Sequence, residues 1–112
     1  MSARLAAGLW VAAYRMRLGA EHIPCYISSK GDETAGDIAV KLCTLDGEAR
    51  IFRRQYDLMT GLRAWAQTDH GPEPEIDALL TRETERDRDL WVIEVESREG
   101  RHLLDDPSLA DG

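Results

Sequence analysis

Cysteine is scarce in this sequence, which excludes the classes of protein that depend on it. The chain holds two cysteines, Cys25 and Cys43, and no CxxC pair. That density is far below the density of a disulfide-stabilised scaffold, and both residues fall in segments predicted as strands, where a free thiol is usually a small buried hydrophobe. We therefore expect a reducing, cytoplasmic compartment for the protein.

Long hydrophobic runs are also missing. The ten-residue stretch LAAGLWVAAY is too short to span a membrane. Arg15 and Arg17 interrupt the apolar run at once, and no small-residue cleavage site follows, so a secretory signal is not predicted. We interpret the stretch as part of a buried helix over residues 3–18, with Leu9 and Met16 on one apolar face that Trp10 widens. No membrane partner is expected.

The spacing patterns of common catalytic and metal sites are absent. The three histidines form no HExxH or HxxxH pair, so a zinc site would have to be assembled from residues far apart in the chain. No GxSxG or SxxK motif supports a nucleophilic enzyme, and no GxxxxGKS/T loop supports phosphate binding. The sequence therefore predicts no catalytic residues, no metal site and no cofactor.

Positive charge is sparse in the second half of the chain. The net charge is -7 for the whole sequence, and it divides into +2 for residues 1–63 and -9 for residues 64–112. An acidic surface repels phosphate backbones, so we expect no nucleic-acid partner. Acidic surfaces also keep small proteins soluble, which accounts for the charge without any function.

What the sequence does contain is a normal share of apolar residues for one folded domain. The 112 residues are 43% hydrophobic, and no repeat, linker or low-complexity segment divides them. We predict a single α+β domain over residues 1–104 and a flexible acidic tail over residues 105–112.

Apolar periodicity predicts the elements of that domain. Alternation typical of strands and the 3.6-residue period of helices give the order helix, four strands, helix, strand. Short connections favour a mostly antiparallel sheet of about five strands with both helices packed on one face. The segments are helices at 3–18 and 75–87 and strands at 23–29, 37–45, 48–56, 62–68 and 90–97. Their inward positions predict a core of Trp10, Val40, Leu42, Ile51, Leu79, Trp91, Ile93 and Val95.

Asp46-Gly47 between two alternating runs is a strong hairpin signal. With a two-residue loop, Leu42 opposes Ile51 and Lys41 opposes Phe52. A three-residue loop with a bulge would change this register, and the sequence leaves both registers open.

Three stretches of the chain resemble a small bacterial family of uncharacterised proteins of about this length. They are LWVAAYRMRL, KGDETAGDIAVKLCTLDG and RDLWVIEVESREGRHLLD, which together extend over nearly the whole chain. The resemblance implies a single cytoplasmic domain. It supplies no activity and no catalytic residues.

The polar loop KGDETAG before the second strand is the first candidate site. Its carboxylates Asp32 and Asp37 could ligate a hard cation, which would support a small metal-dependent hydrolase. Calcium-loop spacing is absent, however, and the glycines suit a polar turn with unusual backbone angles. We favour the turn and keep the hydrolase as the alternative.

The second candidate is a basic face of the predicted hairpin, where Lys41, Arg50 and Arg54 surround Phe52. No other part of this acidic chain brings positive charge and an aromatic ring together. Such a face could bind a small anionic ligand, a protein partner or the acidic half of a second copy, or it could be a solvated surface. We predict a non-enzymatic interaction or ligand-binding module that self-associates as a homodimer.

Overall fold

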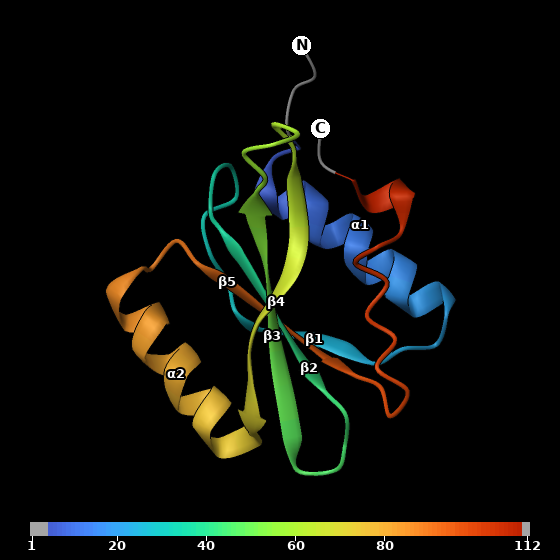
Figure 1. Ribbon diagram of the computed structural model, residues 1–112, viewed down its shortest axis with the longest axis vertical. Helices are drawn as coiled ribbons and strands as arrows, with labels where there is room; N and C mark the ends of the chain where they lie inside the picture. The colour runs from blue at the N-terminus through green and yellow to red at the C-terminus, as the bar shows by residue number, and fades with distance from the viewer. Residues whose placement is uncertain (1–4, 111–112) are drawn as a thin grey trace.

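One helix lies on each face of a twisted five-stranded sheet (Figure 1). The structure, a computed structural model, describes residues 5–110. Its elements follow in chain order: α1 (Ala7–Ala20), β1 (Cys25–Ser29), β2 (Ile38–Cys43), β3 (Glu48–Tyr56), β4 (Arg63–Pro72), α2 (Glu73–Arg86), β5 (Trp91–Glu96) and a short 3-10 turn (Pro107–Leu109).

The strands lie in the order β1-β5-β2-β3-β4. β2 and β5 are parallel, and the other three neighbouring pairs are antiparallel. The predicted α+β class with a mostly antiparallel sheet is therefore confirmed. β4 consequently runs in the same direction as β5, and a connection between parallel strands must cross the sheet, which α2 does.

The predicted placement of both helices on one face is wrong. α1 packs against Val40, Leu42 and Ile93, whereas α2 packs on the other face of the sheet, against Ala39 and Ile51. The physical reason lies in β2, whose six residues are all buried. A strand in the middle of a sheet is covered on both faces when a crossover helix occupies the side that the first helix leaves open.

The hairpin between β2 and β3 has a three-residue connection. Cys43 pairs with Ala49, and the Thr44 N–H donates to the carbonyl oxygen of Glu48 at 3.4 Å. Leu45 and Gly47 take positive φ values of 61° and 89°, as such a connection requires. The two-residue register is thus wrong, and the three-residue alternative is confirmed.

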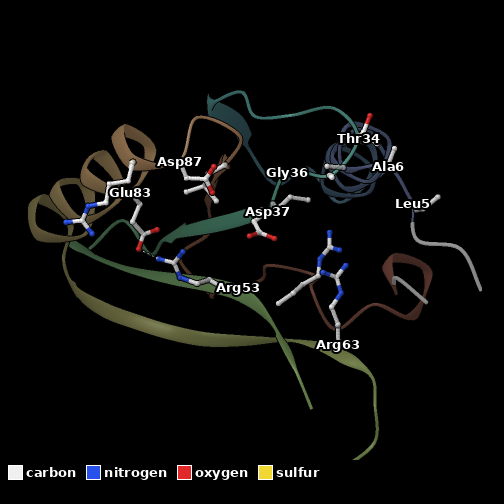
Figure 2. A pocket seen from close by; sticks show the side chains of 15 residues that line it. Leu5, Ala6, Thr34, Gly36, Asp37, Arg53, Arg63, Glu83 and Asp87 are labelled. Atoms are coloured by element: carbon white, nitrogen blue, oxygen red, sulfur yellow. Dashed lines mark hydrogen bonds and ion pairs between the residues drawn. The ribbon is translucent and has the colours of Figure 1, made fainter. Parts of the chain in front are cut away.

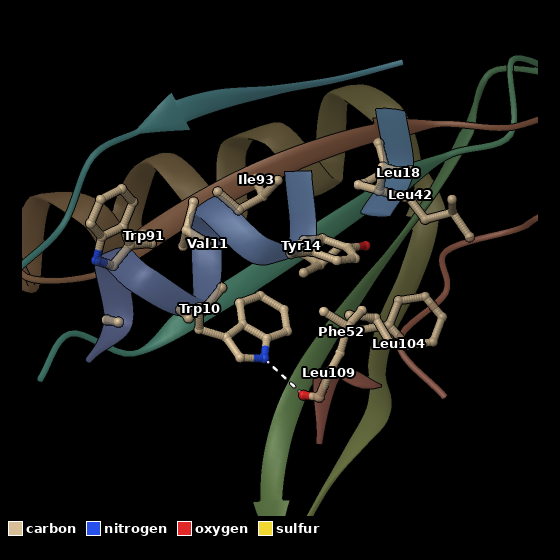
Figure 3. Close-up of a cluster of buried hydrophobic side chains, with 14 of the residues drawn as sticks. Trp10, Val11, Tyr14, Leu18, Leu42, Phe52, Trp91, Ile93, Leu104 and Leu109 are labelled. Carbon is tan, nitrogen blue, oxygen red and sulfur yellow. Dashed lines mark hydrogen bonds between the residues drawn. The ribbon is translucent and has the colours of Figure 1, made fainter. Parts of the chain in front are cut away.

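The larger part of the core lies between α1 and the sheet (Figure 3). Trp10 and Tyr14 are fully buried there. The Trp10 Nε1–H donates to the Leu109 carbonyl oxygen at 2.9 Å, and the Tyr14 hydroxyl donates to the His102 carbonyl oxygen at 2.7 Å. Seven of the eight predicted core residues are buried, and Leu79 is partly buried.

These two hydrogen bonds place the C-terminal segment against α1. The segment predicted as a tail, 105–112, is described as far as residue 110, and Leu109 is buried in the core. The predicted start of the first helix, at residue 3, lies outside the described residues. Within residues 5–110, every helix is too short or too polar to cross a bilayer. Cys25 and Cys43 are both free thiols.

Candidate functional site

A cavity of about 570 Å³ lies beside the open end of β3. The pairing of β2 with β3 ends at Ala39 and Arg53, whereas β3 continues to Tyr56 in its pairing with β4. The loop at 34–37 covers this gap, and the start of α1 and the end of α2 bound it on two sides (Figure 2). The offset between the two strands therefore creates the cavity.

Four arginines from three elements line the cavity: Arg53 and Arg54 from β3, Arg63 from β4 and Arg86 from α2. Arg53 and Arg54 are consecutive, so their side chains leave the strand on opposite faces. Both reach one cavity because β2 begins at Ile38, and within the described part of the chain no strand continues beyond it to separate the two faces of the sheet.

Arg53 is fixed by polar contacts on the α2 side. Its Nη2 lies 2.7 Å from Glu83 Oε1 on α2, and its Nε donates to the Thr68 hydroxyl at 3.2 Å. The Asp69 carboxylate lies 3.9 Å from the same guanidinium. These contacts hold the guanidinium in one orientation at the wall of the cavity.

Arg54 lies against aromatic rings. Its guanidinium carbon lies 5.0 Å from the ring centroid of Trp10 and 5.1 Å from that of Trp65. A guanidinium at this distance from the faces of two indoles is held by cation–π attraction. The buried α1 core therefore positions one of the cavity's cations.

The loop above the cavity is rigidly built around Asp32. The Asp32 carboxylate accepts hydrogen bonds from the backbone N–H groups of Thr34 and Ala35, at 3.1 and 2.8 Å. The Asp32 carbonyl oxygen accepts from Trp91 Nε1 at 2.7 Å. A Cβ atom on Gly36 would lie 2.2 Å from the Asp89 carbonyl oxygen, so only glycine fits there. Asp32 is thus a turn-forming residue.

The charges on the cavity wall differ from those of the chain. The residues that line the cavity include four arginines and three acids, Asp37, Glu83 and Asp87, so their summed formal charge is positive while the chain carries -7. The remaining wall is apolar and includes Leu5, Ile38 and Leu90. A volume of this size with apolar walls and a few convergent polar groups is typical of a small-molecule site.

A second polar cluster surrounds Lys41 on the α2 face of the sheet. The Lys41 side chain is 2% exposed, and its Nζ contacts Glu73 at 2.7 Å, Asp77 at 2.5 Å and Glu94 at 3.0 Å. Burial alone would lower the pKa of Lys41, but the hydrogen bonds to Asp77, Glu73 and Glu94 outweigh it and hold that pKa above its usual value. The amine is therefore a permanent cation and not a nucleophile.

Cys43, Glu73 and Glu94 place three potential metal ligands within 4.8 Å of one another. The Lys41 ammonium already contacts both carboxylates of this group. Burial raises the pKa of the Cys43 thiol to about 12, so the thiolate form that metals bind is disfavoured. We interpret this cluster as an internal ion-pair network that fastens α2 to the sheet.

The structure divides the predicted basic face between two surfaces. Lys41 pairs with Ile51 and faces α2, whereas Phe52 and Arg54 face α1. Phe52 is buried with its ring 4.5 Å from that of His102, and Arg50 is exposed. The three-residue hairpin loop causes this division, because a change of register by one residue moves a side chain to the other face.

Two of the predicted site residues do reach the cavity, Arg54 and Asp37, whereas Asp32 faces its own turn. Sequence reasoning missed Arg53, Arg63 and Arg86. Strand alternation placed Arg53 on the face away from Arg54, and no sequence pattern connects these two with Arg63 and Arg86 further along the chain. These arginines come together because β3 extends beyond the start of β2, and that difference in strand length is known only from the structure.

Comparisons with known proteins agree with this fold over nearly its whole length. A family model described as "Protein of unknown function (DUF1491)" matches residues 5–105. The crystal structure of a DUF1491 family protein from Caulobacter crescentus is 34% identical, with a TM-score of 0.80, over 94% of this chain and 97% of that chain. An NMR structure of a DUF1491 family protein from the same organism is 35% identical, with a TM-score of 0.78, over 95% of this chain and 97% of that chain.

The solution structure of a protein from A. tumefaciens is 30% identical, with a TM-score of 0.70, over 85% of this chain and 87% of that chain. No curated protein matches the sequence. The predicted resemblance to a family of uncharacterised proteins of about this length is confirmed.

Proposed function

Since this chain belongs to the DUF1491 family, whose function is unknown, we propose a function from its own geometry. The protein is a ligand-binding module that holds a small organic anion in the cavity beside the open end of β3. The observation that carries this proposal is the convergence of Arg53, Arg54, Arg63 and Arg86 on one cavity in an acidic chain.

Arginine suits this role because its planar guanidinium forms paired hydrogen bonds with carboxylates and phosphates. Arg53 and Arg54 are held by Glu83 and by two tryptophan rings, so little conformational freedom is lost when an anion binds. The apolar walls favour an anion that also carries a hydrocarbon part.

Hexyl phosphate is a suitable probe, because it combines a phosphate group with a short hydrocarbon chain. Calorimetric titration should show saturable binding of one molecule per chain. Arg54→Gln and Arg86→Gln should each weaken binding about tenfold or more, since a hydrogen bond to a charged group contributes about 1.5–3 kcal/mol.

The matched control is Arg82→Gln, an exposed arginine of α2 outside the cavity wall, which should bind the probe as the natural protein does. Thermal melts establish that each variant is folded. The proposal fails if neither hexyl phosphate nor hexanoate binds at millimolar concentration, or if the two cavity variants bind the probe as tightly as the control.

The other functional expectations from the sequence stay predictions. They are self-association, a cytoplasmic location, and the metal-dependent hydrolase alternative at Asp32 and Asp37. Ligand or partner binding by Lys41, Arg50, Phe52 and Arg54 also stays a prediction for each residue, although the four do not share one face. Arg54 and Asp37, one from each of the two predicted sites, both line the cavity proposed here as the ligand site. Ligand binding in this cavity involves no chemical reaction.

A further inference from the structure

The Asp37 carboxylate is unexpected in an anion-binding cavity, because its negative charge would repel an anion. Asp37 ends the loop above the cavity and lines its wall, and Figure 2 shows its carboxylate directed into the space near Arg53. The backbone of Asp37 is fixed, because its carbonyl oxygen accepts a hydrogen bond from the Trp91 N–H at 2.8 Å. The side chain is therefore delivered to the cavity by a rigid part of the fold.

The other two carboxylates of the wall already have partners. Glu83 Oε1 lies 2.7 Å from Arg53, and Asp87 Oδ1 accepts a hydrogen bond from the Asp89 N–H at 3.0 Å. For Asp37, in contrast, no arginine, lysine or histidine nitrogen of residues 5–110 lies within 4.0 Å of the carboxylate. Asp37 is exposed, so its carboxylate is accessible to a hydrogen-bond donor or a cation.

We infer that the ligand is a zwitterion, in which an anionic group contacts the arginines and a primary amine contacts Asp37, with an apolar spacer between them. This inference rests on the proposed function and specifies its ligand class. A ligand with only negative charge would be repelled by Asp37, whereas an amine would gain a charge-assisted hydrogen bond there. Ile38 and Leu90 lie on the apolar wall, which suits a hydrocarbon spacer.

The test compares two probes that differ in one amine, hexyl phosphate and 6-aminohexyl phosphate. The amine should tighten calorimetric binding about tenfold, as a hydrogen bond between charged groups does. A second pair, hexanoate and 6-aminohexanoate, asks the same question with a carboxylate as the anionic group. Whichever pair binds more tightly identifies the anionic group, and the amine should add affinity in that pair.

Asp37→Asn should remove the advantage of the amine and leave hexyl phosphate bound at least as tightly as before, because a repelling charge is gone. A purely structural role for Asp37 would weaken both probes equally. Glu85→Gln is the control, an exposed acid of α2 outside the cavity wall, and it should retain the preference for the amine.

The outcomes separate this inference from the proposed function. If hexyl phosphate binds and the amine adds nothing, the ligand is a simple anion and the zwitterion is refuted while the anion site stands. If the preference for the amine survives Asp37→Asn, another group binds the amine and the role of Asp37 is refuted. If no probe of either kind binds, the anion site and the zwitterion fail together. Titrations with EDTA exclude a contaminating divalent cation as the bridge to Asp37.

Discussion

Replacing Lys41 by methionine should destabilise the protein strongly at neutral pH. The ammonium of Lys41 is buried between carboxylates of Glu73, Asp77 and Glu94, at 2.7, 2.5 and 3.0 Å. Methionine has similar length and no charge, so it fills the same space and leaves the three carboxylates without their cation. The loss therefore reports the electrostatic role of Lys41 and not the creation of a cavity.

The magnitude follows from how well each carboxylate can be rehydrated. Removing one member of a buried ion pair costs about 3–5 kcal/mol, whereas exposed pairs contribute about 0–1 kcal/mol. Glu73 and Asp77 are 39% and 54% exposed, so water can replace Lys41 there, but Glu94 is 15% exposed. We expect a loss at the lower end, about 3 kcal/mol in the free energy of unfolding.

The loss should depend on pH in a defined direction. Burial alone would raise the pKa of Glu94, but the hydrogen bonds from Lys41 and Ser28 and the positive charge of Lys41 together outweigh burial and hold that pKa below its usual value near 4.5. The hydrogen bond from Lys41 likewise lowers the pKa of Glu73. A carboxyl with a lowered pKa stabilises the fold above its unfolded pKa, and that contribution disappears as pH falls through the folded value. The difference between natural protein and variant should be largest near pH 7 and shrink below about pH 4.5.

The raised pKa of Lys41 adds no change in this range. Its contribution is complete below the ordinary lysine value of 10.5 and is lost only as pH rises beyond that value, so the difference should be constant from pH 6 to 9. Urea unfolding at pH 3, 5, 7 and 9 measures all of these quantities.

Two further variants test the cause. Lys41→Met/Glu94→Gln should recover part of the loss at pH 7, because the desolvated carboxylate is removed as well. Lys30→Met breaks an exposed pair with Glu33 and should cost less than about 1 kcal/mol. A Lys41→Met protein as stable as the natural one at pH 7, or a loss equal at pH 3 and pH 7, would refute the reasoning.

Two shorter predictions concern the packing of the same fold. Gly36→Ala should lower the melting temperature sharply, because its Cβ would lie 2.2 Å from the Asp89 carbonyl oxygen. Gly19→Ala, in α1, would meet no atom within 4 Å and should add about 0.5 kcal/mol to the free energy of unfolding. Equal melting temperatures for the two variants would contradict the rigid loop. Ile93→Ala, at a fully buried position of β5, should cost about 2–5 kcal/mol in urea unfolding, and a melt unchanged within about a degree would be incompatible with its burial.

Local patterns predicted the elements of this fold well, since alternation and turn residues act over a few neighbouring positions. They did not determine which side of α1 is buried, because large apolar residues occur on more than one side of the helix. Leu9 and Met16 are 59% and 77% exposed, whereas Trp10 and Tyr14 on the other side are fully buried. The burial of large aromatic rings stabilises the fold most, and the sheet offers them a surface only in the assembled structure.

The faces of the sheet were beyond sequence reasoning for a related reason. The sequence of β2 predicts a strand with one solvent-exposed face, because Lys41 interrupts its apolar residues. That face is in fact covered by α2, and three carboxylates from two distant elements make a buried lysine possible there. No sequence pattern near Lys41 predicts that Glu73, Asp77 and Glu94 are its partners.

The candidate site follows from the unequal lengths of β2 and β3. In a continuous sheet, the side chains of consecutive arginines such as Arg53 and Arg54 point to opposite faces and cannot contact the same ligand. Here β2 begins at Ile38, so the end of β3 has no strand paired on that side within residues 5–110, and residues from both of its faces line one cavity. The loop over that space must then be rigid, because a mobile loop would fill the gap with its own side chains. The Asp32 turn and the close contact at Gly36 supply that rigidity, and they deliver Asp37 to the arginines. The polar loop is therefore structural in its first half and part of the cavity wall in its second half.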